Sequence, residues 1–168
     1  MEKLWSPWRS QYIQSFKEAK KKSNCIFCDA VSEDIFSDDS LVVRKAKLTF
    51  TVLNLYPYNN GHLMIVPNRH LNDFQNLTAE ENAEIMSELQ LAQKCLSIVS
   101  RPDGFNIGAN IGKSSGAGID DHIHFHIVPR WNGDTNFMPV LGEAKVLSQD
   151  LLNTKKELIR AYESVLNL

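Results

Sequence analysis

The sequence is poor in cysteine, in long apolar runs and in net charge. Its 168 residues include three cysteines, which cannot all pair and do not form the disulfide framework of a small secreted protein. No uncharged apolar stretch approaches the roughly 20 residues of a membrane span, and the opening MEKLWSPWRS carries no apolar signal core. The net charge of −2 creates no field that would favour nucleic acid or an anionic lipid surface. We therefore expect a cytoplasmic protein with no nucleic-acid or membrane partner.

The composition is that of a soluble globular protein, with 43% hydrophobic and 23% charged residues. It excludes disordered, collagen-like and low-complexity chains, and the length fits about one domain. We expect a central domain with an extension at each end. The predicted divisions are an N-terminal arm with a helix over 1–24, the domain over 25–140, and a C-terminal extension with a helix over 141–168.

Apolar spacing predicts the secondary structure. The segment Thr78-Ala79-Glu80-Glu81 is a capping box at the start of a long amphipathic helix. Strands in series with one long helix between them favour an α+β fold, built on an antiparallel sheet with one long and one C-terminal helix. The expected strands lie near 41–43, 49–53, 63–66, 105–110 and 122–128, and the expected helices near 10–22, 78–100 and 149–167.

Three of the five histidines stand in one short segment, His122-Ile123-His124-Phe125-His126-Ile127-Val128. Because side chains alternate along a strand, the histidines are expected on one face and the apolar residues on the other. At about 3.3 Å per residue, the outer two histidines would lie roughly 13 Å apart, too far for all three to bind one ion. A row of imidazoles can bind metal, attack phosphorus or a carbonyl carbon, or shuttle protons. The alternative is a set of exposed strand histidines without a role.

A glycine-rich loop precedes the histidines. It runs from Asn110 to Gly118 and offers an amide side chain, serine hydroxyls and a backbone able to form an anion-binding nest. Glycine-rich turns are common, so the loop alone is weak evidence. Directly before the histidines, it suggests a phosphate group held beside an imidazole nucleophile.

The pair Cys25-Ile26-Phe27-Cys28 is a C-x2-C motif, which in a cytosolic chain indicates metal binding or redox chemistry before a structural disulfide. Two unligated thiols are the third possibility. Cys95 falls on the apolar side of the long predicted helix, so we expect it to pack in the core.

Together these motifs resemble the histidine triad (HIT) family of nucleotide hydrolases and transferases. The resemblance covers about residues 25–130, and the two ends of the chain are similar to a bacterial branch described as diadenosine tetraphosphate phosphorylases. It rests on the 122–128 segment, Leu53-Asn54-Leu55, the run from Asn60 to Pro67, Arg69-His70, Leu4-Trp5-Ser6-Pro7-Trp8-Arg9, Pro129-Arg130-Trp131 and the run from Gly133 to Pro139.

The resemblance implies a role for most of these residues. His124 would be the nucleophile that forms a nucleotidyl-histidine intermediate, and a hydrogen-bond acceptor must fix its tautomer so that a bare nitrogen faces the substrate. His126 would hold an α-phosphate oxygen, Asn110 would donate to the phosphate and His62 would support the histidines. The nucleotide-binding set is completed by Asn54 on the ribose, the backbone of Gly116, Ala117 and Gly118 on the phosphate, and Trp131, which either lines the site for the second nucleoside or covers the core.

The resemblance also implies a zinc site and a homodimer. Cys25 and Cys28 would bind a structural Zn²⁺ with His70 and His122, which leaves His124 and His126 for chemistry. One departure from the family stands before the triad, where many members carry a hydroxyl that protonates the leaving group. This chain has none there, although Ser114 or Ser115 could replace it.

The expected activity is nucleotidyl transfer from a dinucleoside polyphosphate or a nucleoside 5′-phosphate derivative, as phosphorolysis or hydrolysis of diadenosine tetraphosphate. The alternatives are a nucleoside phosphoramidase and a non-catalytic nucleotide- and zinc-binding module. Replacement of His124 separates the classes, because a binding module has no turnover to lose.

Overall fold

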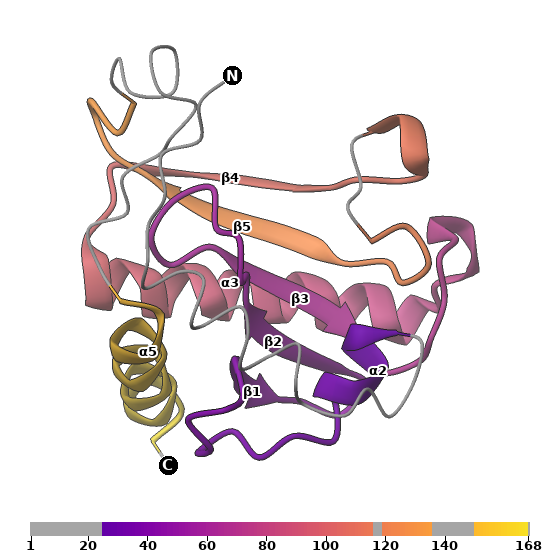
Figure 1. The fold of residues 1–168 in the computed structure, drawn as a ribbon, viewed down its shortest axis with the longest axis horizontal. Helices are drawn as coiled ribbons and strands as arrows, with labels where there is room; N and C mark the ends of the chain where they lie inside the picture. Colours follow the sequence, from indigo (N-terminus) through magenta and orange to yellow (C-terminus); the bar gives the residue numbers. More distant parts are fainter. Residues whose placement is uncertain (1–24, 116–118, 136–149, 168) are drawn as a thin grey trace, which may run out of the picture.

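The computed structural model describes residues 25–115, 119–135 and 150–167, so the helix expected near 10–22 lies outside the described residues. Five strands form one sheet, with helices in front of it and behind it (Figure 1). The elements in chain order are α2 (Ile26–Ala30), β1 (Val42–Lys45), β2 (Thr49–Leu53), β3 (Leu63–Pro67), the 3-10 helix η1 (Phe74–Asn76), α3 (Ala79–Ser100), β4 (Gly104–Ala109), the 3-10 helix η2 (Lys113–Ser115), β5 (Phe125–Arg130) and α5 (Leu151–Leu166).

The sheet is antiparallel throughout, in the order β1-β2-β3-β5-β4. The expected α+β architecture is therefore confirmed. Helix α3 runs behind the sheet and α2 lies in front of it (Figure 1). The apolar face of α3, with Ile85, Leu89 and Leu96, is buried against the sheet, and α5 packs on α3 and β1. No described helix is long and apolar enough to cross a membrane.

The long helix begins where the capping box predicts. The Thr78 side chain accepts a hydrogen bond from the Glu81 backbone N–H, and the Glu81 carboxylate accepts one from the Thr78 N–H at 2.9 Å. These two bonds satisfy donors that a helix start otherwise leaves unpaired. The helix ends at Ser100, and its C-cap residue, Arg101, adopts a left-handed conformation with φ 45°.

The histidine segment departs from its prediction. Strand β5 begins at Phe125 rather than His122, and His122, Ile123 and His124 are buried ahead of it, where His122 and His124 both contact the Phe27 ring and Ile123 lies in the core. Tertiary contacts explain the difference. The Ile123 N–H donates to the Leu71 carbonyl instead of to a neighbouring strand, and the His122 ring N–H bonds to the Pro67 carbonyl.

Gly61 occupies the turn before β3 and cannot be replaced without strain. Its φ is +73°, and a Cβ there would lie 2.9 Å from Leu96 Cδ2 in the core. We expect Gly61→Ala to lower the free energy of unfolding by about 1–3 kcal/mol in urea titration. The alanine would be held at an unfavourable positive φ, and the Leu96 side chain would have to move. The matched control is Gly104→Ala, since in the described part of the chain no heavy atom other than those of its chain neighbours lies within 4 Å of a Cβ at that position. Equal stability of the two variants would contradict the prediction.

Candidate functional site

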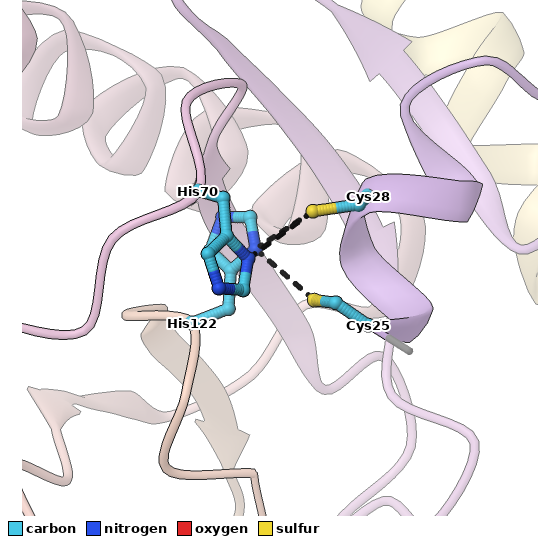
Figure 2. A group of neighbouring side chains, drawn as sticks. All are labelled: Cys25, Cys28, His70 and His122. Carbon is cyan, nitrogen blue, oxygen red and sulfur yellow. Dashed lines mark hydrogen bonds between the residues drawn. The ribbon is translucent and has the colours of Figure 1, made fainter. Parts of the chain in front are cut away.

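Two cysteines and two histidines meet in front of the sheet (Figure 2). Cys25 and Cys28 come from the start of α2, His70 follows β3, and His122 precedes β5. The Cys25 sulfur lies 3.3 Å from His122 Nδ1, and the Cys28 sulfur lies 3.2 Å from His70 Nδ1 and 3.7 Å from His122 Nδ1. The four ligand atoms all lie within 4.8 Å of one another.

The geometry of this cluster suits a metal ion. His122 donates its Nε2–H to the Pro67 carbonyl at 2.9 Å, so its Nδ1 carries a lone pair that faces both sulfurs. Around a tetrahedral Zn²⁺, adjacent nitrogen and sulfur ligands lie roughly 3.3–3.8 Å apart, close to the observed separations. The cluster Cys25, Cys28, His70 and His122 could therefore bind a metal ion.

His124 is buried with its tautomer fixed. Its Nδ1 lies 2.9 Å from the His122 carbonyl oxygen, which can only accept, so Nδ1 carries the proton and Nε2 is bare. Burial also lowers the pKa of His124 and keeps the ring neutral. Phe27, between the two cysteines, packs against this ring at 5.0 Å between centroids. His124 thus has the form of imidazole that a nucleophile requires.

His62 and His126 form a second hydrogen-bonded pair. The Tyr58 backbone N–H donates to His62 Nδ1 at 3.1 Å, so the His62 proton stands on Nε2 and is donated to His126 Nδ1 at 2.9 Å. The remaining proton of His126 must then stand on Nε2, and this buried atom has no hydrogen-bond partner among the described residues. Asn54, at 3.3 Å from His62 Nδ1, completes the group. An unpaired buried donor beside a bare imidazole nitrogen can bind an anionic oxygen.

This pair is uncharged at neutral pH. Burial and the neighbouring histidines lower the pKa of His62 to about 3, and burial and His124 lower the pKa of His126 to about 4. No full positive charge therefore stands on the pair, which must act through its N–H groups and lone pairs.

These shifts predict how stability depends on pH. Below about pH 6.5 the unfolded chain binds protons at His62 and His126 that the folded protein does not, so the free energy of unfolding falls as pH drops from 6.5 toward 4. Urea titrations between pH 7 and 5 should show this decrease, and His62→Gln should show a shallower slope. An unchanged slope in the variant would contradict the assignment.

A cavity of about 610 Å³ opens beside His126, between the β4–β5 face and the 58–59 turn. Asn110 and Ser115 line it together with His126, whereas Asn54 lies beside His62. Trp131 lies past the end of β5, where its indole N–H donates to the Ser100 carbonyl at 3.3 Å. Gly116, Ala117 and Gly118 fall outside the described residues.

Sequence reasoning assigned no role to a polar network at the far end of this cavity. Arg130 donates to both Asp134 carboxylate oxygens, at 2.6 and 2.9 Å, and to Asn106 Oδ1 at 2.7 Å. Asn59 Nδ2 donates to Asp134 at 2.7 Å, and the pKa of Asp134 is held well below its usual range by these donors, Arg130 first. The only sequence signal was the spacing of Arg130 and Asp134, four residues apart around a turn.

Comparison with known proteins agrees with this geometry. The HIT domain model matches residues 36–133. The chain is 41% identical over 160 residues to a Mycobacterium tuberculosis AP-4-A phosphorylase, covering 93% of this chain and 82% of the relative. It is 28% identical over 109 residues to a Schizosaccharomyces pombe adenosine 5′-monophosphoramidase, a match that covers 65% of this chain and 76% of the relative.

Among solved structures, a Zn-bound histidine triad family protein from Mycobacterium smegmatis superposes with a TM-score of 0.68 at 24% identity, covering 86% of this chain and 96% of that one. The fold is therefore shared, and the named sequence relatives are enzymes. By its domain match and its identity to a phosphorylase along most of its length, the chain belongs to the HIT family.

Proposed function

We propose that this protein is an enzyme that transfers a nucleotidyl group from a dinucleoside polyphosphate through a covalent intermediate on His124. One observation carries the proposal: the bare Nε2 of His124 lies in one cluster with the unpaired Nε2–H of His126, with ring centroids 4.8 Å apart. A nucleophile and an oxyanion donor are the two groups that attack at phosphorus requires. The relatives that act on diadenosine tetraphosphate and adenosine phosphoramidate support the substrate class.

In this mechanism His124 Nε2 attacks the α-phosphorus, the bond to the leaving polyphosphate breaks, and an N–P bond forms. The neutral imidazole is nucleophilic near pH 7 and leaves readily in the second step. His126 Nε2–H donates to a non-bridging oxygen, and His62 fixes the tautomer of His126 through the 2.9 Å bond. Phosphate or water then attacks the same phosphorus and releases His124.

The remaining roles complete the proposed site. Asn110 donates to the phosphate from the cavity wall, with the backbone of Gly116, Ala117 and Gly118. Asn54 holds the ribose, and Trp131 belongs to the nucleotide-binding set. Ser115 lines the cavity, so it is the better placed of the two serines to assist the leaving group.

The metal in this proposal is Zn²⁺, held by Cys25, Cys28, His70 and His122. When bound, it supplies a structural cross-link between α2 and the segment that carries His124. The chemistry itself stays with the imidazoles, because all four metal ligands differ from the proposed nucleophile and phosphate donor.

We further propose a cytoplasmic homodimer. Strand β4 lies at the end of the strand order and has its edge free within the described sheet, and Ile107 and Ile111 are each about half exposed there. An open edge with apolar side chains is a surface that a second copy can cover. The division into arm, 25–140 domain and C-terminal extension belongs to the same proposal, and α5 packs on the central domain.

Product analysis after incubation with diadenosine tetraphosphate tests the reaction. With inorganic phosphate, we expect ATP and ADP by ion-exchange chromatography, and neither product without it. Appearance of ATP and AMP, or of ADP alone, in the absence of phosphate would establish hydrolysis instead. If adenosine phosphoramidate is turned over and diadenosine tetraphosphate is not, the protein is a phosphoramidase. Tight nucleotide binding without turnover of any substrate would overturn the proposal of a catalytic function.

A further inference from the structure

We propose that the 610 Å³ cavity beside His126 binds the leaving half of the substrate, a nucleoside polyphosphate, and that Gly108 keeps this subsite open. This inference rests on the proposed function, because a leaving half exists only if His124 takes the other half. It assigns substrate selectivity to strand β4, which carries none of the residues discussed so far as acting on phosphorus.

Strand register places the cavity along one face of the sheet. Gly108 is the cross-strand partner of His126, and Asn106 is the partner of Val128. Cross-strand partners point to the same face, and so do residues two apart, so Arg130 shares this face as well. The floor of the cavity therefore runs from His126 to Arg130, roughly 13 Å at about 3.3 Å per residue.

The lining suits a nucleotide. The side-chain amides of Asn106 and Asn110 line the cavity and offer donors for phosphate oxygens, sugar hydroxyls and base edges. The Tyr58 ring, 53% exposed, offers a flat face at the entrance. The volume lies within the roughly 300–1,000 Å³ of small-molecule sites.

Its charges do not oppose a polyanion. Among the described residues that line the cavity, the one carboxylate is Asp134, which is neutralised by the two hydrogen bonds from Arg130 and also accepts from Asn59. Arg130 in turn donates Nη1 to Asn106, which aims the amide of Asn106 from the cavity floor. The network thus holds a polar wall with no unpaired negative charge.

The cavity beside His126 depends on the absence of a side chain at Gly108. A Cβ built at Gly108 has no heavy atom of the described residues within 4 Å apart from its own chain neighbours, so a side chain there would enter open space rather than the described core. It would stand about 5 Å from the Cβ of its partner His126, on the same face. A larger residue at this position would therefore extend into the cavity next to His126.

The test is Gly108→Val, with Gly104→Val as the matched control. Gly104 is on the same strand and face and is equally open, but it does not line the cavity. The substrates are diadenosine tetraphosphate, whose leaving half is a nucleoside polyphosphate, and adenosine 5′-phosphoramidate, whose leaving group is ammonia. For Gly108→Val we expect kcat/KM to fall at least ~10-fold on the first substrate and less than about twofold on the second. Gly104→Val should leave both unchanged.

Equal losses on both substrates would overturn the inference, because the valine would then be disturbing His126 itself. Unchanged turnover of diadenosine tetraphosphate would overturn it as well. A binding measurement separates this failure from that of the proposed function. ATP titrated by calorimetry into protein saturated with AMP should bind wild type and Gly104→Val at least ~10-fold more tightly than Gly108→Val, whether or not the protein turns over. Equal ATP affinities would place the leaving half elsewhere.

Discussion

Replacement of His124 by alanine should lower kcat/KM for diadenosine tetraphosphate by roughly 10⁴-fold or more, the scale seen when a covalent nucleophile is removed. The reason is the fixed tautomer: only the bare Nε2 of His124 combines burial, neutrality and a proton held away on Nδ1 by the His122 carbonyl. The measurement is steady-state turnover together with rapid-quench trapping of α-³²P-labelled protein. Wild type should trap label, and His124→Ala should trap none.

The control is His126→Ala, which removes the proposed oxyanion donor and leaves the nucleophile in place. We expect this variant to lose roughly 10²-fold in kcat, as for loss of one oxyanion donor, while it still traps label on His124. Matching thermal midpoints for both variants and wild type would exclude misfolding. More than about 1% residual turnover in His124→Ala would remove His124 from the nucleophile's role, because so small a loss is out of scale with covalent catalysis.

Removal of the metal ligands is the second change with a large expected effect. Cys28→Ser should abolish binding of one Zn²⁺ per chain and lower the free energy of unfolding by about 4 kcal/mol, equivalent to about 8–16 °C in Tm for a domain of this size. The physical reason is that the four ligands come from three distant segments, joined at α2, after β3 and before β5. Metal content by mass spectrometry and calorimetric unfolding measure the two effects.

Cys95→Ala provides the matched control for the metal experiment. Cys95 is fully buried on α3, apart from the cluster, so its loss should cost about 1 kcal/mol through packing and leave the zinc content unchanged. A wild-type protein that binds no Zn²⁺, or whose Tm is the same with and without the ion, would contradict the structural role.

Local pattern was enough to predict the sheet and both described long helices. Strand β2 and the start of α3 agree with the sequence because their signals are local: an apolar run between turns and a reciprocal cap. These strand and helix signals depend on neighbours in sequence. The ligand cluster was implied by the family resemblance instead, and the chain does bring its four residues together from distant segments.

The features that the sequence did not reveal depend on distant partners. The first three residues of the 122–128 segment leave the sheet because Pro67 and Leu71 accept their hydrogen bonds. The Asp134 network joins Asn59, Asn106 and Arg130, which come from three separate stretches of chain. Pairings of this kind have no periodicity, so only the folded chain shows them.

The position of His122 between the metal ligands and His124 affects how inhibition by a metal chelator should be interpreted. Its ring nitrogen faces the cysteine sulfurs, while its own carbonyl oxygen holds the proton of His124. Any rotation of this residue after withdrawal of an ion would therefore be transmitted to the attacking nitrogen two positions along the chain. A chelator that silences the enzyme would be easy to mistake for proof of Lewis-acid catalysis. Under the proposed structural role of the ion, the same result would report a lost scaffold rather than a metal ion acting on the substrate.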